Sequence, residues 1–407
     1  MGRGFVASLA ALASAVVLLA GCSSGGGDST AASGAASTAG GKVASGTPIK
    51  FGVVSPVTGV SAVPAFQQGV KAAAAYVNNQ LGGVKGHPLE MEYCDDQGQD
   101  PSKNTACVHK FVADNVVAIL NYGSAFGTAS LPIATAAGIS TFTPGSALSE
   151  DQSKYAIILH ADTESGYAAA FSHLKKQGKK SVGSIMTNIP ETISLFRGIL
   201  PPAARKGGVD FVRMVVVDPT ATDFTPEVLK ASQGVDTVTM SLGPAQMAQT
   251  LQNAQAAGVQ AQFAVSNVAI DEKNFVQPAG SAAEGVVAYS GVDLYNSSAS
   301  QAVTYRDQME KAGFGAGIGG VSEQGFSFAM TAYTALSDMK QYNAGALRDY
   351  FNSHKVPVYL GQVYDASKTP FPDRPAIHVT AARVVQVKNG QFADVGGGWI
   401  DTYAGGS

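Results

Sequence analysis

Charged residues are scarce in this chain: they make up 14% of its 407 residues, and the formal net charge is −3. A chain of this kind has no basic field for a polyanion, so we expect no nucleic-acid partner. Beyond the first 21 residues no stretch approaches about 18 consecutive apolar residues, the length that a membrane-spanning helix needs. The body of the chain is therefore predicted to fold in water.

Cysteine is also rare, with three residues: Cys22, Cys94 and Cys107. Cys94 ends an expected strand and Cys107 lies inside the next expected helix. In an oxidising compartment this pair predicts a disulfide worth about 3 kcal/mol. The alternative is a metal site of Cys94, Cys107 and His109, which has no fourth ligand at a useful spacing. We expect neither a metal nor a cofactor.

Motifs for catalysis are weak. Gly123-Ser124-Ala125-Phe126-Gly127 has the wrong spacing for a nucleophile elbow, and Gly325-Phe326-Ser327-Phe328-Ala329 comes near but opens a helix with no strand before it. Asp95-Asp96 is a possible acid–base pair, although a solvated or helix-capping pair is commoner. The sequence therefore predicts a protein that is not an enzyme, with a hydrolase that uses Ser124 or Ser327 as a minor alternative.

The first residues have the pattern of an export signal. Arg3 precedes an apolar run over residues 5–20, which is short for a membrane span, and the run ends in Leu19-Ala20-Gly21-Cys22. This ending resembles the lipobox of bacterial lipoproteins, in which the Cys receives a diacylglyceryl group. We expect residues 1–21 to be a lipoprotein signal peptide. Residues 22–47 are the expected lipidated Cys22 with a flexible Ser/Gly/Ala/Thr tether.

Strand-like and helix-like segments alternate twice along the rest of the chain. The first run spans residues 49–143, and the second starts at residue 167 and continues to about residue 289. Such alternation predicts parallel sheets covered by helices on both faces. The expected fold class is α/β, with two similar three-layer lobes and mainly parallel sheets joined by several crossover segments.

Two neighbouring strand ends carry small hydroxyl residues. Tyr122-Gly123-Ser124 and Pro144-Gly145-Ser146 each end an expected strand. Free backbone N–H groups and hydroxyls at such turns can bind a carboxylate, and ligands of open α/β sheets bind at the carboxyl ends of strands. The alternative is that both Ser residues only cap local turns.

An ordered set of short motifs resembles the substrate-binding proteins of branched-chain amino-acid ABC importers, which have the type I periplasmic-binding-protein fold. The resemblance covers residues 48–399. It rests on the following segments: Ile49-Lys50-Phe51-Gly52-Val53-Val54, Leu81-Gly82-Gly83-Val84-Lys85-Gly86, Tyr93-Cys94-Asp95-Asp96, Asp223-Phe224 and Ala279-Gly280-Ser281-Ala282-Ala283-Glu284-Gly285.

The resemblance implies a ligand site between two lobes. Lobe 1 is expected over residues 48–161 plus 292–352, and lobe 2 over residues 162–291 plus 353–405. A Ser at the position of Ser124 and groups at the turn after Pro144 hold the ligand carboxylate in that family, and the acidic residue for a ligand ammonium aligns near Asn267. The predicted ligand-binding residues are Ser124, Phe126, Ser146, Ala147, Asn188, Gly243 and Asn267.

Three positions depart from the family pattern. Ala147 replaces a common Thr, Pro64 stands where an aromatic residue often lies, and Asn267 supplies no countercharge for an ammonium. These departures weaken the assignment of a plain branched-chain amino acid, and the expected ligand is a branched-chain or related amino acid, or an organic acid or amide.

The implied function is that of a solute receptor that delivers a small carboxylate-bearing molecule to ABC permease subunits. We expect a monomer, lipid-anchored on the extracytoplasmic face of the cell membrane. The alternative is a ligand-sensing or envelope-regulatory receptor with the same fold that is not coupled to transport.

Overall fold

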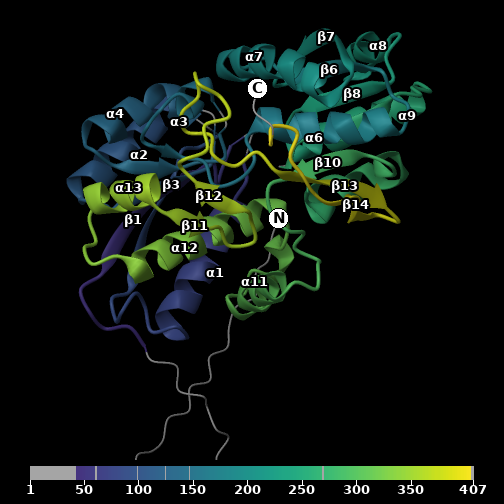
Figure 1. Ribbon diagram of the computed structural model, residues 1–407. Helices are drawn as coiled ribbons and strands as arrows, with labels where there is room; N and C mark the ends of the chain where they lie inside the picture. The colour runs from purple at the N-terminus through teal and green to yellow at the C-terminus, as the bar shows by residue number, and fades with distance from the viewer. Residues whose placement is uncertain are drawn as a thin grey trace, which may run out of the picture. The chain divides into compact units, whose positions relative to one another are not determined.

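The computed structural model describes residues 43–59, 62–98, 100–123, 125–145, 147–267 and 270–404. The expected signal peptide, Cys22 and most of the tether lie outside the described residues. These described residues form one compact unit of alternating strands and helices (Figure 1). No described helix has both the length and the apolar character needed to cross a membrane.

The first sheet has five strands in the order β2-β1-β3-β4-β5, and every neighbouring pair is parallel. Its interior strand β1 is buried along almost its whole length, as expected for a parallel strand covered on both faces. The strands are β1 (Ile49–Ser55), β2 (Leu89–Asp95), β3 (Ala118–Asn121), β4 (Ser140–Phe142) and β5 (Ala156–Ile157).

Helices cover both faces of this sheet (Figure 1). Phe51 and Val53 pack in one apolar cluster with Phe66 of α1, whereas Val54 packs in another with Phe111 of α2. The helices that pack on this sheet, or on another helix that covers it, are α1 (Ala65–Asn79), α2 (Pro101–Ala113), α3 (Ala125–Ala129), α4 (Leu131–Ala136), α5 (Leu148–Asp151), α11 (Ser300–Lys311), α12 (Gly320–Asp338) and α13 (Ala344–Ser353).

The second sheet has seven strands in the order β14-β13-β10-β9-β8-β6-β7, parallel from β7 to β10 and antiparallel at β13 and β14. The expected α/β class with mainly parallel sheets is confirmed. The strands are β6 (Ser181–Thr187), β7 (Asp210–Val217), β8 (Thr237–Ser241), β9 (Gln262–Val265), β10 (Val287–Ser290), β13 (Ala382–Lys388) and β14 (Gln391–Ile400), with helices α6 (Thr163–Lys176), α7 (Pro190–Gly207), α8 (Thr225–Ser232), α9 (Pro244–Ala256) and α10 (Gln277–Ala279).

The residue pattern also predicts a break at Pro201-Pro202 in the helix over residues 191–206, a single helix over residues 125–137 and a strand over residues 377–388. The structure differs from each of these three local predictions. Helix α7 was expected to break at Pro201-Pro202 but continues through both residues, because Ile199 and Ala203 on either side of them are buried in one apolar cluster. The single helix expected over residues 125–137 is two short helices that meet at Ser130. The strand expected over residues 377–388 begins only at Ala382, and Ile377 makes an isolated bridge to Ile158.

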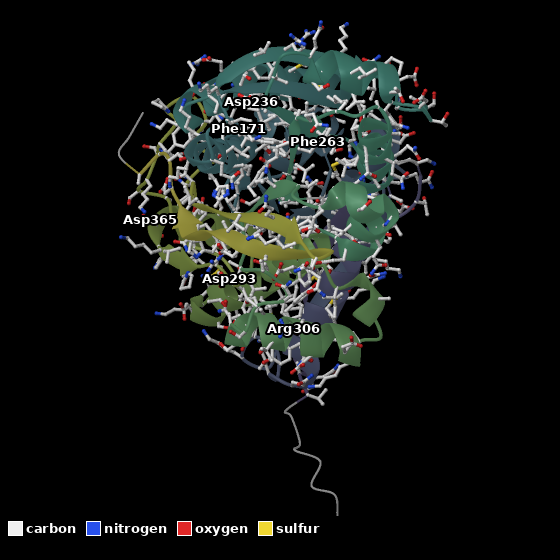
Figure 2. All side chains as sticks on the ribbon, turned by 90° about the vertical axis from the view of Figure 1, so that its right-hand side faces the viewer. Phe171, Asp236, Phe263, Asp293, Arg306 and Asp365 are labelled. Atoms are coloured by element: carbon white, nitrogen blue, oxygen red, sulfur yellow. A yellow bond between two sulfur atoms is a disulfide. The ribbon has the colours of Figure 1, made fainter. Side chains whose placement is uncertain are left out.

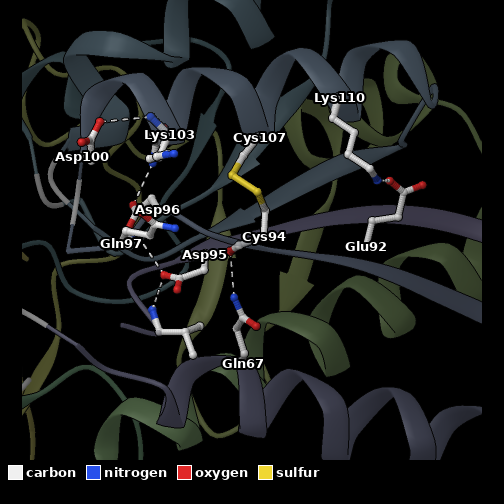
Figure 3. The surroundings of a disulfide bond; sticks show 12 residues. Gln67, Glu92, Cys94, Asp95, Asp96, Gln97, Asp100, Lys103, Cys107 and Lys110 are labelled. Carbon is white, nitrogen blue, oxygen red and sulfur yellow. Dashed lines mark hydrogen bonds and ion pairs between the residues drawn. A yellow bond between two sulfur atoms is a disulfide. The ribbon is translucent and has the colours of Figure 1, made fainter. Parts of the chain in front are cut away.

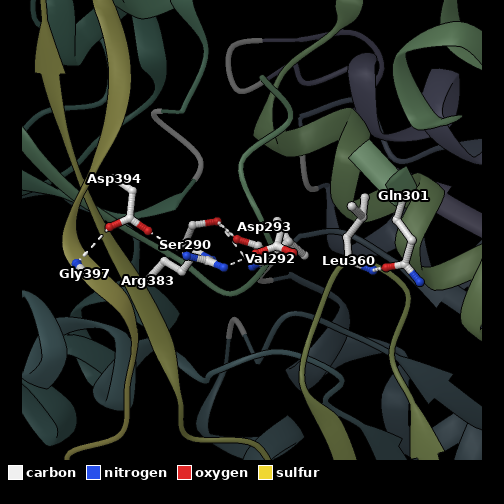
Figure 4. A network of polar contacts seen from close by, with 8 residues as sticks. All are labelled: Ser290, Val292, Asp293, Gln301, Leu360, Arg383, Asp394 and Gly397. Atoms are coloured by element: carbon white, nitrogen blue, oxygen red, sulfur yellow. Dashed lines mark hydrogen bonds and ion pairs between the residues drawn. The ribbon is translucent and has the colours of Figure 1, made fainter. Parts of the chain in front are cut away.

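The chain passes between the two sheets three times: between β5 and α6, between β10 and α11, and between β12 (Val363–Asp365) and β13. Figure 4 shows a polar network at the second crossing, and Figure 2 shows Asp293 beside the β13–β14 ribbon. Asp293 forms an ion pair with Arg383 of β13 (2.5 Å), and Arg383 also pairs with Asp394 of β14 (2.7 Å). The backbone N–H of Asp293 donates to the carbonyl of Leu360, just before β12 (2.6 Å). These contacts join the second crossing to the β13–β14 ribbon and to the segment just before β12.

The disulfide predicted between Cys94 and Cys107 is present (Figure 3). It links the end of β2 to α2, with 5.9 Å between the two Cα atoms. The Gln67 amide of α1 donates to the carbonyl of Cys94 (2.9 Å). The end of β2 is therefore held from both sides of the sheet.

Helices α1 and α12 pack with their backbones in contact at two glycines. A Cβ atom on Gly69 of α1 would lie 1.9 Å from the carbonyl oxygen of Ser322, and one on Gly325 of α12 would lie 2.2 Å from the carbonyl oxygen of Phe66. Neither neighbour can move as a flexible side chain would. Both positions therefore require glycine for this close approach.

Replacing Gly69 with Ala is expected to lower the free energy of unfolding by about 1–3 kcal/mol, because the added methyl group forces α1 and α12 apart. Gly198 provides a matched control, since it lies inside α7 and a Cβ there meets nothing within 4 Å. Gly198→Ala is expected to stabilise the protein by about 0.5–1 kcal/mol through helix propensity. Urea unfolding measures both variants, and equal effects of the same sign would contradict this account of the helix contact.

Candidate functional site

A cavity of about 620 Å³ is lined by residues that follow strands of both sheets. On the side of the first sheet, Tyr122 and Gly123 follow β3, and Pro144 follows β4. On the side of the second sheet, Ser241 ends β8 and Asn267 follows β9. The cavity thus lies at the carboxyl ends of parallel strands, where ligands of open α/β sheets bind.

A second hollow of about 460 Å³ lies at the opposite ends of β6, β8 and β9, around Asp236. The Asp236 carboxylate there accepts hydrogen bonds from the backbone N–H groups of Lys180 (2.7 Å) and Ser181 (3.2 Å) and from the Ser181 hydroxyl (3.2 Å). These bonds, that of Lys180 foremost, lower the pKa of Asp236. The carboxylate of this second hollow is therefore already taken up by hydrogen bonds from the protein itself. The cavity between the sheets is the better candidate for a ligand site.

The walls of the cavity are apolar in large part. Leu195 and Phe196 of α7 and Leu242 after β8 are buried side chains that line it, and Val63 and Phe314 are partly buried. Hydroxyl groups stand among them, from Tyr122, Thr163, Thr187, Ser241, Ser266 and Tyr289. This mixture of an apolar wall and a few polar groups is typical of small-molecule sites.

Charged side chains in the described lining are those of Asp271 and Lys273. Asp271 accepts two hydrogen bonds from Asn274, from its backbone N–H (2.9 Å) and from its side-chain amide (2.6 Å). Asp271 therefore caps the π-helix Glu272–Val276, and Lys273 is exposed. The two charges lie on one short segment of the lining, which also holds Asn274.

Two tyrosines enter the cavity lining from the two sheets. Tyr122 is 6% exposed and Tyr289 is 2% exposed, and burial raises the pKa of both phenols. Both hydroxyls therefore stay protonated at neutral pH. Thr163 hydrogen-bonds the Tyr289 hydroxyl, whereas the Tyr122 hydroxyl has no partner among the described residues. Tyr289 also needs Gly166, because a Cβ there would lie 2.2 Å from its ring.

Of the predicted ligand-binding residues, Gly243 and Asn267 both lie in the cavity lining. Ala147 is buried beside Gly127, and the backbone of Asn188 donates to Val217 (2.8 Å); the cavity lining includes neither residue. Ser124, Ser146 and the Phe126 side chain lie outside what the structure describes. Their ligand contacts remain predictions, although Gly123 and Pro144, just before the two serine turns, do line the cavity.

Sequence reasoning missed several lining residues. Ile189, Thr192, Leu195 and Phe196 follow one another along α7 at helical spacing, which was a visible signal. Tyr122 was noted only as part of a strand-end turn. No motif distinguishes these residues from ordinary core positions, because their exposure to the cavity depends on how α7 packs beside β6.

Three of the weak catalytic candidates, Ser327, Asp95 and Asp96, make structural contacts, whereas Ser124 lies outside the described residues. Ser327 is fully buried in α12, where it donates to the carbonyl of Tyr359 (2.5 Å) and contacts His160 (3.1 Å). Asp95 holds the loop after β1 through Thr58, and Asp96 accepts from Asn104 (2.9 Å). The described part of the chain has no group of three or more His, Cys, Asp and Glu side chains placed to hold a metal ion.

Known proteins share this architecture. A possible leucine/isoleucine/valine-binding protein from Rhodopirellula baltica SH 1 has a TM-score of 0.74 and 18% identity, covering 88% of this chain and 98% of that one. A fatty acid ABC transporter substrate-binding protein from Thermomonospora curvata has a TM-score of 0.71 and 22% identity over 88% and 93%. A solute-binding protein of an ABC transporter from R. palustris, in complex with 4-hydroxybenzoate, has a TM-score of 0.71 and 16% identity over 87% and 96%.

These identities are low, and the likeness therefore shows the fold alone, that of type I periplasmic binding proteins. No curated protein matches the sequence. The family model described as periplasmic binding protein matches residues 48–391, which is most of the chain. The chain belongs to the periplasmic binding protein family.

Proposed function

We propose that this protein is the extracytoplasmic solute-binding receptor of an ABC importer and that it captures a small carboxylate-bearing molecule. The observation that carries the proposal is the single cavity lined by strand ends of both sheets. Three crossings connect the segments that carry these walls, so the two proposed lobes can close over a ligand. The permease then recognises the closed form by its different contact surface.

The family membership and the printed functions of the similar proteins support this proposal. Three similar proteins are described as binding, respectively, leucine/isoleucine/valine, fatty acid and 4-hydroxybenzoate, and all three kinds of ligand carry a carboxylate. In our proposal the receptor is a monomer, held at the membrane surface by a lipid on Cys22. Fatty-acid labelling that persists in a Cys22→Ala variant would contradict the anchor.

The receptor function is tested by ligand-induced stabilisation of the Cys22→Ala chain. A panel of amino acids, aliphatic acids, aromatic acids and their amides is screened by thermal unfolding. A ligand present at about 100 times its Kd is expected to add about 2.7 kcal/mol to the free energy of unfolding. Ser124→Ala is expected to weaken that binding by about 1–3 kcal/mol, because a buried carboxylate oxygen loses a donor. A panel without a single hit would refute the receptor function as stated.

A further inference from the structure

Two long helices begin at the cavity, and no acidic side chain of their first turns neutralises the positive ends of their dipoles. Helix α1 contributes Pro64 and Ala65 to the lining, and α9 contributes Gly243 and Pro244. Helix α1 has no side-chain cap hydrogen bond, the Gly243 N–H at the start of α9 donates to the neutral Gln246 side chain (3.4 Å), and neither helix has an acidic residue in its first turn. The free N–H groups and the positive ends of the two helix dipoles therefore favour an anion in the cavity.

The Tyr122 hydroxyl adds an independent observation. It belongs to a side chain that is more than nine-tenths buried and lines the cavity, and its oxygen has no hydrogen-bond partner in the described part of the chain. A buried hydroxyl without a partner is costly, and a native structure has few of them. Because the phenol keeps its proton, the group that would satisfy it is an acceptor such as a carboxylate oxygen.

An ammonium group finds no comparable partner. Asp271 is the acidic side chain in the described lining, and both of its oxygens already accept hydrogen bonds from Asn274. Asn267, at the position that the family resemblance gives to the ammonium partner, is a neutral amide. The Lys273 ammonium lies on the same segment as Asp271, so a ligand cation moved into this cavity would lose its hydration with no uncompensated negative charge in return, which is unfavourable.

We propose that the receptor selects monocarboxylates that have an apolar body and no ammonium group, that is, aliphatic or aromatic acids rather than α-amino acids. The Tyr122 hydroxyl holds the carboxylate in the field of the α1 and α9 N-termini. The apolar body packs against Leu195, Phe196 and Leu242. This inference rests on the proposed function, because it names the solute class of the same cavity.

Matched pairs of small molecules test the inference by calorimetry on the Cys22→Ala chain. The probes are 4-methylpentanoate against leucine, 3-phenylpropanoate against phenylalanine, and 4-methylpentanamide as the uncharged analogue. We expect at least one acid to bind at least about tenfold more tightly than its amino acid, and 4-methylpentanoate to bind more tightly than 4-methylpentanamide. An amino acid that binds as tightly as its acid would overturn the inference and leave the receptor function standing. If none of the five probes binds, the inference is overturned. The receptor function is refuted only if the panel screened by thermal unfolding also gives no hit.

Two variants test the assignment of the carboxylate to Tyr122. Tyr122→Phe is expected to weaken acid binding about tenfold while leaving the ligand-free protein as stable as before or more so, since an unpaired buried hydroxyl is removed. Tyr295→Phe is the matched control: its hydroxyl is also buried without a described partner, but Tyr295 does not line the cavity. Its acid affinity is expected to be unchanged. Equal affinities of the two variants would refute the role of Tyr122.

A substitution at the opposite wall gives a separate readout. Asn267→Asp introduces a negative charge into the cavity lining, and it is expected to weaken acid binding about tenfold by repulsion. If the natural ligand instead carries an ammonium group, the same substitution should leave the affinity for leucine unchanged or increase it. Tighter binding of the amino acid together with unchanged binding of the acid would therefore overturn the inference.

Discussion

Replacing Arg374 with Met is expected to lower the free energy of unfolding by about 3–5 kcal/mol, the largest loss that we expect from a single substitution in this protein. Arg374 lies in the third crossing between the sheets and is 7% exposed. Its guanidinium pairs with Glu164 (2.9 Å) and Asp162 (3.8 Å) at the start of α6, and it stacks on the Phe371 ring (3.8 Å). Without it two buried carboxylates lose their cation.

The expected loss depends on pH. Burial raises the pKa values of Asp151, Asp162 and Glu164, and the Arg374 charge opposes that rise. A carboxyl whose folded-state pKa lies above its unfolded value stabilises the fold at low pH, and this contribution is lost as pH rises through the folded pKa. Removing Arg374 raises these folded-state pKa values further. The difference between wild type and Arg374→Met is therefore expected to be larger at pH 7.5 than at pH 5.

Lys110→Met is the control for Arg374. Lys110 pairs with Glu92 at 2.6 Å, a shorter distance than either Arg374 pair, but its side chain is 60% exposed. Exposed ion pairs contribute only about 0–1 kcal/mol, so this variant should remain close to wild type. Urea unfolding at the two pH values measures both substitutions. A similar loss in both variants, or an Arg374→Met defect that grows at pH 5, would contradict the role given to the buried cluster.

The alternation of strands and helices could be read from the sequence because buried parallel strands are continuous apolar runs and the helices between them show one apolar face. The apolar runs over residues 49–54 and 262–265 predict strands, and β1 and β9 occupy almost the same residues. Short elements escaped prediction. β5 has two residues, and β11 (Lys355–Pro357) and β12 have three each, so none is long enough for a periodic pattern. Their pairing is set by tertiary contacts.

The candidate site was predictable only in its location. Strand ends of a parallel sheet meet at one edge, so the turns after β3, β4, β8 and β9 could be expected to converge. Which side chain of each turn faces the cavity depends on helix packing: Asn188 was predicted, whereas its neighbour Ile189 lines the cavity. Leu195 and Phe196 come from deeper in α7. Their position follows from the burial of α7 against α6, which the local sequence does not encode.

The disulfide gives the second large expected effect. A double variant Cys94→Ala/Cys107→Ala is expected to lose about 3 kcal/mol of unfolding free energy, because the unfolded chain regains the freedom of a loop with a sequence separation of 13 residues. Cys107 is buried against Val108 and Phe111 on the outer face of the first sheet, so part of the loss comes from that packing. Chemical unfolding in oxidising buffer measures the difference from wild type.

Reductant separates the covalent link from the packing of the two side chains. With dithiothreitol the wild type should lose most of the difference and approach the double variant, and the double variant should not respond. The end of β2 is also held by Gln67 through the Cys94 carbonyl, a contact that both substitutions preserve. The cavity residues lie on other segments, so ligand affinity should survive in the double variant at temperatures well below its unfolding transition. Identical stability of wild type with and without reductant would show that the bond contributes nothing to the fold.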